Sequence, residues 1–185
     1  VKRLLKSLNV DDEKFPPKEL TWFINAQKEA GLRPAAVEAY DDWTRRRVEL
    51  YAAYEAQCQR EGVVDFAELL LRSYELLERN EPLRRHYQER FAHILVDEFQ
   101  DTNKLQYAWL KLLAGEHGAL FCVGDDDQSI YAFRGADVGN MRDFEREFRV
   151  PNLIRLEQNY RSHGNILDAA NAIIQNNPQR LGKSL

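Results

Sequence analysis

A chain of 185 residues with a formal net charge of −4 has an ordinary globular composition, with 44% hydrophobic and 30% charged residues. This balance excludes a disordered chain and provides apolar surface for one good core or two small ones. No apolar run is long enough to cross a bilayer and the N-terminus does not resemble a signal peptide, so we expect a cytoplasmic protein without a membrane partner. The mildly acidic charge excludes nucleic-acid binding by bulk electrostatics alone.

The cysteines and histidines indicate neither a disulfide nor a metal site. Cys58 and Cys122 lie far apart, and Cys122 stands in an apolar run, so we expect reduced, buried thiols. The four histidines lack metal-ligand spacing. The chain begins with Val1 inside a helical pattern, which we interpret as part of a longer protein.

Residues 1–91 have a helical pattern throughout. The first long helix follows Pro16–Pro17 and ends near Gly31, as expected for proline near the start of a helix and glycine just after its end. The second includes Trp43 and ends near Gly62. Aromatic residues on these helices are most simply core residues, and a ligand surface is the less favoured alternative.

A third helix is predicted after Asp65, whose side chain can cap it while Glu68 reaches back in a capping box. Its expected apolar face consists of Phe66, Leu69, Leu70, Tyr74 and Leu77. Residues 81–91 predict a fourth helix. This half of the sequence does not by itself indicate a function.

From residue 92 the pattern alternates between strands and helices. The predicted strands are 94–96, 119–123 and 153–156, and the predicted helices are 105–114, 138–148 and 165–174. Spacings of this length are typical of successive parallel crossover units. The sequence therefore predicts an α/β protein, in which an all-α domain (residues 1–91) precedes a partial parallel sheet (residues 92–185).

Polar clusters follow each of the three predicted strands. They comprise residues 97–103, 124–136 and 157–162. Because ligands collect at the carboxyl ends of parallel strands, we expect the three clusters to converge on one edge of the sheet.

Four of these polar residues have the chemistry of a nucleoside triphosphatase. Asp97 can hold a hydrated Mg²⁺ and Glu98 can orient or deprotonate a water. Gln128 can hydrogen-bond a γ-phosphate or the water in line with it, and Arg161 can neutralise charge on the transferred phosphoryl group. The alternative for the two acids alone is a helix cap or a solvated loop.

Aromatic residues in the later clusters suit stacking on nucleobases. Tyr160 offers a flat face for the base of ATP, and a tyrosine packed on the last helix is the alternative. Tyr131, Phe133 and Arg134 form an aromatic and cationic surface of the kind that binds single-stranded nucleic acid. The alternative buries one ring and uses Arg134–Gly135 as a turn.

Three motifs in this order resemble those of the UvrD/Rep/PcrA group of superfamily 1 DNA helicases, closest to its UvrD-type members. The similar segments are Asp97–Asp101, Gly124–Ala136 and Gln158–Ser162, which resemble the second, third and fourth helicase motifs. Residues 1–91, including Val64–Leu70, resemble the inserted 1B domain of these enzymes. The second half then resembles part of the RecA-like motor domain 1A.

The resemblance implies an ATP-driven, Mg²⁺-dependent motor that moves 3′ to 5′ on single-stranded DNA and opens duplex DNA, with DNA-repair proteins as partners. It implies that Asp97 and Glu98 serve Mg²⁺ and water, that Gln128 and Arg161 contact the γ-phosphate and that Tyr160 stacks on ATP. Tyr131, Phe133 and Arg134 would contact DNA. Phe133 stands where the group commonly has tryptophan, so stacking is expected to persist more weakly.

The phosphate-cradling Gly-x-x-x-x-Gly-Lys-Ser/Thr loop has no counterpart in the sequence. Gly182–Ser184 imitates its end, but Asn177 occupies the position of the first glycine and no strand precedes it, so we interpret the match as a coincidence. We therefore expect this chain alone to hydrolyse ATP negligibly. Two alternatives stay open: a DNA- or protein-binding interaction module, and part of a helicase-nuclease subunit.

Overall fold

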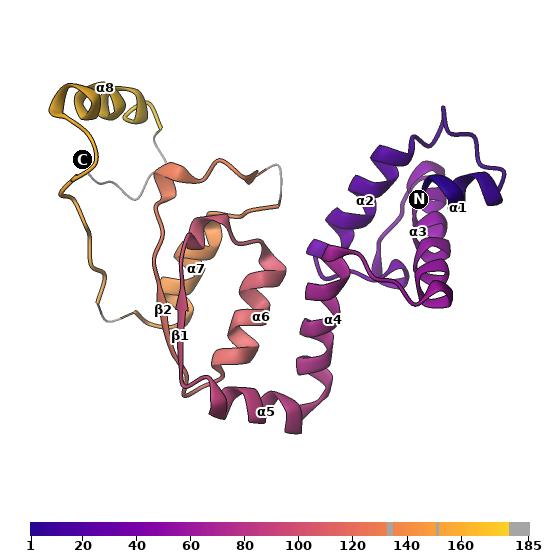
Figure 1. Ribbon diagram of the computed structural model, residues 1–185, viewed down its shortest axis with the longest axis horizontal. Coiled ribbons are helices and arrows are strands. Elements are labelled where there is room, and N and C mark those ends of the chain that lie inside the picture. Colours follow the sequence, from indigo (N-terminus) through magenta and orange to yellow (C-terminus); the bar gives the residue numbers. More distant parts are fainter. Residues whose placement is uncertain (133–134, 151, 178–185) are drawn as a thin grey trace. The chain divides into compact units, whose positions relative to one another are not determined.

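The computed structural model describes residues 1–132, 135–150 and 152–177, which form mostly helices together with one small parallel sheet (Figure 1). The chain divides into two compact units, residues 1–94 with 103–120 and residues 95–102 with 121–185. This division does not follow the boundary predicted at residue 91. None of the helices in the described ranges is long and apolar enough to cross a membrane.

The first unit contains six α-helices among its described residues. They are α1 (Lys2–Ser7), α2 (Pro17–Glu29), α3 (Asp42–Glu61), α4 (Phe66–Arg79), α5 (Glu81–Arg90) and α6 (Lys104–Ala114). Leu5, Leu20, Ile24, Leu50 and Tyr51 form the buried apolar cluster of α1, α2 and α3. The short α5 lies crosswise at the end of α4 (Figure 1).

Local sequence signals explain where these helices begin and end. Gly62 follows α3 in the left-handed region at φ 65°, and Asp65 caps α4 by accepting a 2.7 Å hydrogen bond from the Glu68 amide. The predicted capping box is nevertheless only half formed. The Glu68 side chain turns inward and pairs with Lys28 instead of returning to the backbone of Asp65.

The prediction of which residues form the buried face of α4 is wrong in the first turn of the helix. Phe66 is 93% exposed and Leu69 is 55% exposed, whereas Leu71, Leu77 and Glu68 are buried. The periodicity of apolar residues misses this face because a carboxylate, Glu68, occupies one of its inward positions.

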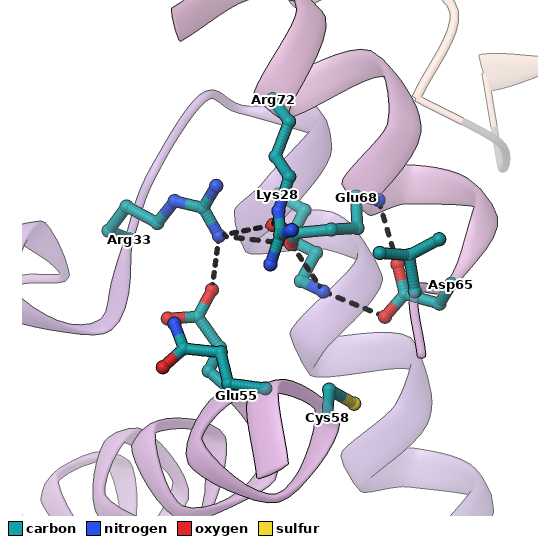
Figure 2. Close-up of a pocket in the computed structure, with 9 residues that line it drawn as sticks. Lys28, Arg33, Glu55, Cys58, Asp65, Glu68 and Arg72 are labelled. Atoms are coloured by element: carbon teal, nitrogen blue, oxygen red, sulfur yellow. Dashed lines mark hydrogen bonds and ion pairs between the residues drawn. The ribbon is translucent and has the colours of Figure 1, made fainter. Parts of the chain in front are cut away.

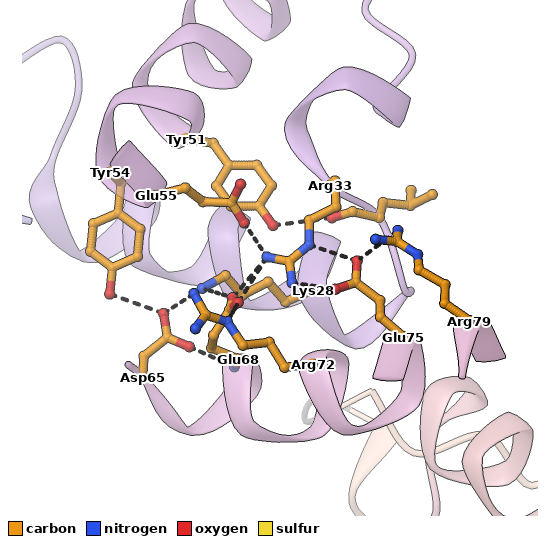
Figure 3. A network of polar contacts seen from close by, with 11 residues as sticks. Lys28, Arg33, Tyr51, Tyr54, Glu55, Asp65, Glu68, Arg72, Glu75 and Arg79 are labelled. Carbon is orange, nitrogen blue, oxygen red and sulfur yellow. Dashed lines mark hydrogen bonds and ion pairs between the residues drawn. The ribbon is translucent and has the colours of Figure 1, made fainter. Parts of the chain in front are cut away.

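A network of ion pairs joins α2, α3 and α4 (Figure 3). Lys28, only 2% exposed, places its Nζ 2.7 Å from Asp65 Oδ2 and 2.8 Å from Glu68 Oε2. Tyr54 donates a 2.9 Å hydrogen bond to the same Asp65 oxygen. Burial alone would raise the pKa of Asp65 and of Glu68, but the hydrogen bonds, with Lys28 first, outweigh it and hold both pKa values below their usual range.

Arg33 forms the other half of this network. Its guanidinium contacts Glu55 at 2.5 Å, Glu68 at 2.9 Å and Glu75 at 2.7 Å. The hydrogen bond to Glu75 is the main cause of a raised pKa for Arg33, and it also lowers the pKa of Glu75. The network therefore stays ionised at neutral pH and ties three helices together through charge as well as through the apolar core.

The sheet consists of two strands, β1 (His93–Val96) and β2 (Ala119–Cys122). The Ala119 amide donates a hydrogen bond to the Ala92 carbonyl (2.9 Å), and the Val123 amide donates one to the Val96 carbonyl (2.8 Å). The bonded residues advance in the same direction along both strands, so the pair is parallel. Residues alternate along each strand between exposed and half-buried. Only one face of the pair is therefore covered.

The predicted third strand does not form. Residues 153–156 have no regular secondary structure, and Leu153, Ile154 and Leu156 are 59%, 72% and 79% exposed. An isolated apolar run becomes a strand only when a neighbouring strand accepts and donates its backbone hydrogen bonds. The second unit also contains α7 (Gly139–Glu147) and α8 (Gly164–Ile174), and none of the eleven described residues of α8 is buried.

Candidate functional site

The chain makes an unusual turn directly after β1. In a regular parallel ladder the amide of Glu98 would bond to the Val123 carbonyl, but the amide of Phe99 makes this bond instead, at 2.9 Å. Glu98 is the extra residue, with φ 51° and ψ 43°, and its amide bonds to Asp97 Oδ1 at 2.9 Å. This bulge leaves the side chains of both acids exposed at the end of the strand.

The buried side chain of Gln100, only 1% exposed, connects this turn with the loop after β2. Its Nε2 donates a 2.7 Å hydrogen bond to Glu98 Oε2, and its Oε1 accepts a 2.9 Å hydrogen bond from the Asp125 amide. The predictions assigned no role to Gln100. Its position inside the polar cluster after β1 was the available signal, but spacing alone does not distinguish it from its neighbours.

Gly124, the residue before Asp125, makes room for this amide. A Cβ atom on Gly124 would lie 2.9 Å from Gln100 Oε1 and 3.3 Å from the Gln100 backbone nitrogen. Its backbone has an ordinary φ, so the glycine is required by close packing rather than by a left-handed conformation.

Asp125 organises the loop that carries Gln128. Its carboxylate accepts hydrogen bonds from the Asp127 amide at 3.2 Å and from Gln128 Nε2 at 2.7 Å. Gln128 is exposed and Tyr131 is half-buried. Phe133 and Arg134, both predicted to contact DNA, lie outside the described residues.

The segment that carries Tyr160 and Arg161 is a separate turn. Asn159 Oδ1 accepts hydrogen bonds from the amides of Arg161 (2.9 Å) and Ser162 (3.0 Å), and Tyr160 is 86% exposed. Within the described ranges, no hydrogen bond or ion pair joins either predicted side chain to Glu98 or Gln128. The structure thus connects two of the three predicted clusters directly, and the convergence of the third remains a prediction.

A group of acidic side chains lies on the loop after β2. The carboxylates of Asp125, Asp126 and Asp127 come within 4.8 Å of one another, the one such group found in the described part of the chain. Asp97, the predicted Mg²⁺ ligand, does not belong to this group. Because Asp125 already accepts hydrogen bonds within the loop, we assign no ion to this acidic group.

The helical unit contains two hollows. One is a water-sized space of about 10 Å³ bordered by Lys28, Arg33, Cys58 and Glu68 (Figure 2). The other is an open groove of about 1060 Å³ along α3 and α4, with Ala52 and Ala56 among its lining residues. Arginines and glutamates both line the groove, and Arg33 pairs there with Glu55 and Glu75. These charges therefore favour no particular ligand.

Comparison with known proteins identifies the family of this chain. The pattern of the UvrD/REP helicase N-terminal domain matches residues 1–149. The chain belongs to this family. It is 54% identical over its whole length to DNA helicase II of Haemophilus influenzae, 53% identical to DNA helicase II of Escherichia coli and 42% identical to the ATP-dependent DNA helicase PcrA of Staphylococcus aureus.

These UvrD/REP-type relatives are much longer proteins. The chain spans about a quarter of the length of each: 25% of the Haemophilus protein and 26% of the other two. The resemblance drawn from the three motifs is therefore confirmed for the family. The roles of individual residues are not tested by these comparisons.

Proposed function

We propose that this chain is part of an ATP-dependent DNA helicase, and that the turn after β1 and the loop after β2 form one side of its ATP-hydrolysing site. The observation that supports this most is the hydrogen-bonded connection from Glu98 through Gln100 and Asp125 to Gln128. Two polar segments that follow adjacent parallel strands are thereby held together at the edge where α/β proteins bind nucleotides.

The side chain of Asp97 fits a hydrated Mg²⁺. One of its oxygens accepts a hydrogen bond from the Glu98 amide, and the exposed carboxylate supplies the hard oxygen ligand that this cation prefers. Bound Mg²⁺ would supply charge neutralisation at the phosphates of ATP. We assign Glu98 to orient the attacking water and accept its proton as oxygen bonds to the γ-phosphorus and the bond to ADP breaks.

The remaining assignments concern nucleotide and DNA contacts. Gln128 and Arg161 contact the γ-phosphate, and Tyr160 stacks on the base of ATP. Tyr131, Phe133 and Arg134 contact single-stranded DNA. In this proposal the enzyme moves 3′ to 5′, unwinds duplex DNA and acts with DNA-repair proteins, with residues 1–91 as a 1B-like domain and residues 92–185 as part of a RecA-like 1A domain.

The central test compares two glutamate variants of the full-length protein. Glu98→Gln should abolish DNA-stimulated ATP turnover, because it removes the proton acceptor. It should preserve the binding of a fluorescent ATP analogue, because the volume of the side chain hardly changes. Glu116→Gln, at an exposed glutamate in the segment before β2, is the matched control and should keep wild-type turnover. Equal rates for the two variants would remove Glu98 from the chemistry.

The activity of the 185-residue chain itself is a separate test. We expect negligible ATP hydrolysis even with saturating single-stranded DNA, because the sequence contains no phosphate-cradling loop. Robust turnover would contradict this expectation. Tight binding of duplex DNA that persists when Tyr131, Phe133 and Arg134 are replaced by alanine, measured by fluorescence anisotropy, would instead favour the interaction-module alternative.

A further inference from the structure

The amide of Gln100 is held in one orientation by the chemistry of its two partners. The carboxylate of Glu98 can only accept a hydrogen bond, so the Gln100 NH₂ group must face it. The backbone N–H of Asp125 can only donate, so the Gln100 oxygen must face that loop. A hydrophobic side chain of the same length could satisfy neither partner.

Gln100 makes the one hydrogen bond that the Glu98 carboxylate receives within the described residues. Because Glu98 is exposed, packing does little to fix the direction of its side chain. The bond reaches only Oε2, and a carboxylate has further lone pairs that can accept from a water. Gln100 can therefore hold Glu98 without blocking it.

Asp125 extends the connection to the second loop. Its backbone donates to Gln100 and its carboxylate accepts from Gln128, so one residue carries both bonds. The links between Gln128 and Asp125, Asp125 and Gln100, and Gln100 and Glu98 measure 2.7, 2.9 and 2.7 Å. A shift of the loop that carries Gln128 would therefore displace the Gln100 amide and, with it, Glu98.

We propose that Gln100 is a positioning residue, which holds Glu98 in the orientation for water activation and makes this orientation depend on the loop that carries Gln128. This inference rests on the proposed ATP hydrolysis and adds a residue to which that proposal gave no role. Gly124 supports it independently, since a methyl group there would press on Gln100 Oε1 at 2.9 Å.

The experiment measures steady-state ATP hydrolysis by the full-length protein with saturating single-stranded DNA. Gln100→Met keeps the length of the side chain and removes both hydrogen bonds, and we expect kcat to fall about 10- to 100-fold while KM for ATP stays within about twofold. Gln100→Glu retains an acceptor for the Asp125 amide but brings a second carboxylate to Glu98. It should show the same split between kcat and KM.

Two glycine variants separate positioning from folding. Gly124→Ala leaves Gln100 in the sequence but crowds its amide, so it should reproduce the loss of kcat at unchanged KM. Gly164→Ala is the matched control, because a Cβ there has nothing within 4 Å, and it should have wild-type kinetics. Melting temperatures and nucleotide binding are measured for every variant, and kcat is expressed per folded molecule.

A double variant tests whether Gln100 acts through Glu98. Once Glu98→Gln has removed the proton acceptor, adding Gln100→Met should lower the residual rate by less than twofold, since residues that act as a unit are not additive. A multiplicative further loss would overturn the inference.

Two results distinguish failure of this inference from failure of the proposed function. In the first, Glu98→Gln is inactive, but Gln100→Met keeps kcat within twofold of wild type or loses activity only in proportion to its unfolded fraction. Gln100 then does not position Glu98, and the proposed function stands. If Glu98→Gln itself keeps wild-type turnover, the assignment of Glu98 fails and the inference fails with it.

Discussion

Replacing Lys28 with methionine should strongly destabilise the helical unit. The ammonium group is 2% exposed and lies 2.7 and 2.8 Å from Asp65 and Glu68, so its removal leaves two carboxylates without their shared cation. Breaking a buried pair costs about 3 to 5 kcal/mol. We expect the lower end, about 3 kcal/mol, because Glu68 keeps Arg33 and Arg72 as partners and Asp65 remains 21% exposed.

Tryptophan fluorescence during urea unfolding of the 185-residue chain is a suitable assay. Trp22, Trp43 and Trp109 are the three tryptophans of the sequence, and all lie in the first unit. With a slope of about 2 kcal/mol per molar urea, a loss of 3 kcal/mol lowers the midpoint by about 1.5 M.

Arg79→Met provides the matched control. Arg79 is 73% exposed and lies 3.8 Å from Glu75, so its loss should cost at most about 1 kcal/mol. Adding Asp65→Asn to Lys28→Met should recover part of the midpoint, because it removes the carboxylate that is left without a cation while asparagine can still cap α4. The reasoning fails if Lys28→Met lowers the midpoint no more than Arg79→Met does.

Three further outcomes are expected. Because the folded-state pKa values of Asp65 and Glu68 are lowered, their contribution is fully present above about pH 5, decreases as the pH falls below the ordinary pKa values and is gone only below the lowered folded-state values, so the urea midpoint should decrease from about pH 6 to about pH 3. A midpoint that is equal at both pH values contradicts this. Burial raises the pKa of Cys122 to about 11, so iodoacetamide should label it slowly at pH 8 and rapidly in urea, as read by mass spectrometry. Gly62→Ala should cost about 1 kcal/mol through its φ of 65° alone, since a Cβ there has nothing within 4 Å, and an unchanged urea midpoint would contradict this.

The sequence predicted the helices better than it predicted the strands or the buried face of α4, both of which depend on partners that are distant in the sequence. The patterns that place helices at 81–91 and 105–114 are local, and α5 and α6 are found at Glu81–Arg90 and Lys104–Ala114. The strand predicted at 153–156 failed because a strand depends on a neighbour that local sequence does not specify. The predicted face of α4 was wrong for a related reason, since Glu68 points inward to pair with Lys28 and Arg33, which are distant in the sequence.

For the candidate site, the sequence indicated which segments matter but not how they are connected. The polar residues after β1 and β2 predicted that Glu98 and Gln128 belong together, and the structure joins them through Gln100 and Asp125. The bulge at Glu98 could not be predicted, because nothing in the residue type of a glutamate indicates a left-handed backbone.

The ion pairs among α2, α3 and α4 have a consequence for how this sequence can change over evolutionary time. Loss of Lys28 alone would remove the cation that Asp65 and Glu68 share, and loss of either acid alone would leave the buried Lys28 with one carboxylate partner fewer. Single substitutions at these positions should therefore be selected against, while joint replacements that keep the charges matched should be tolerated. In an alignment of homologous sequences, positions 28, 65 and 68 are then expected to covary as one group.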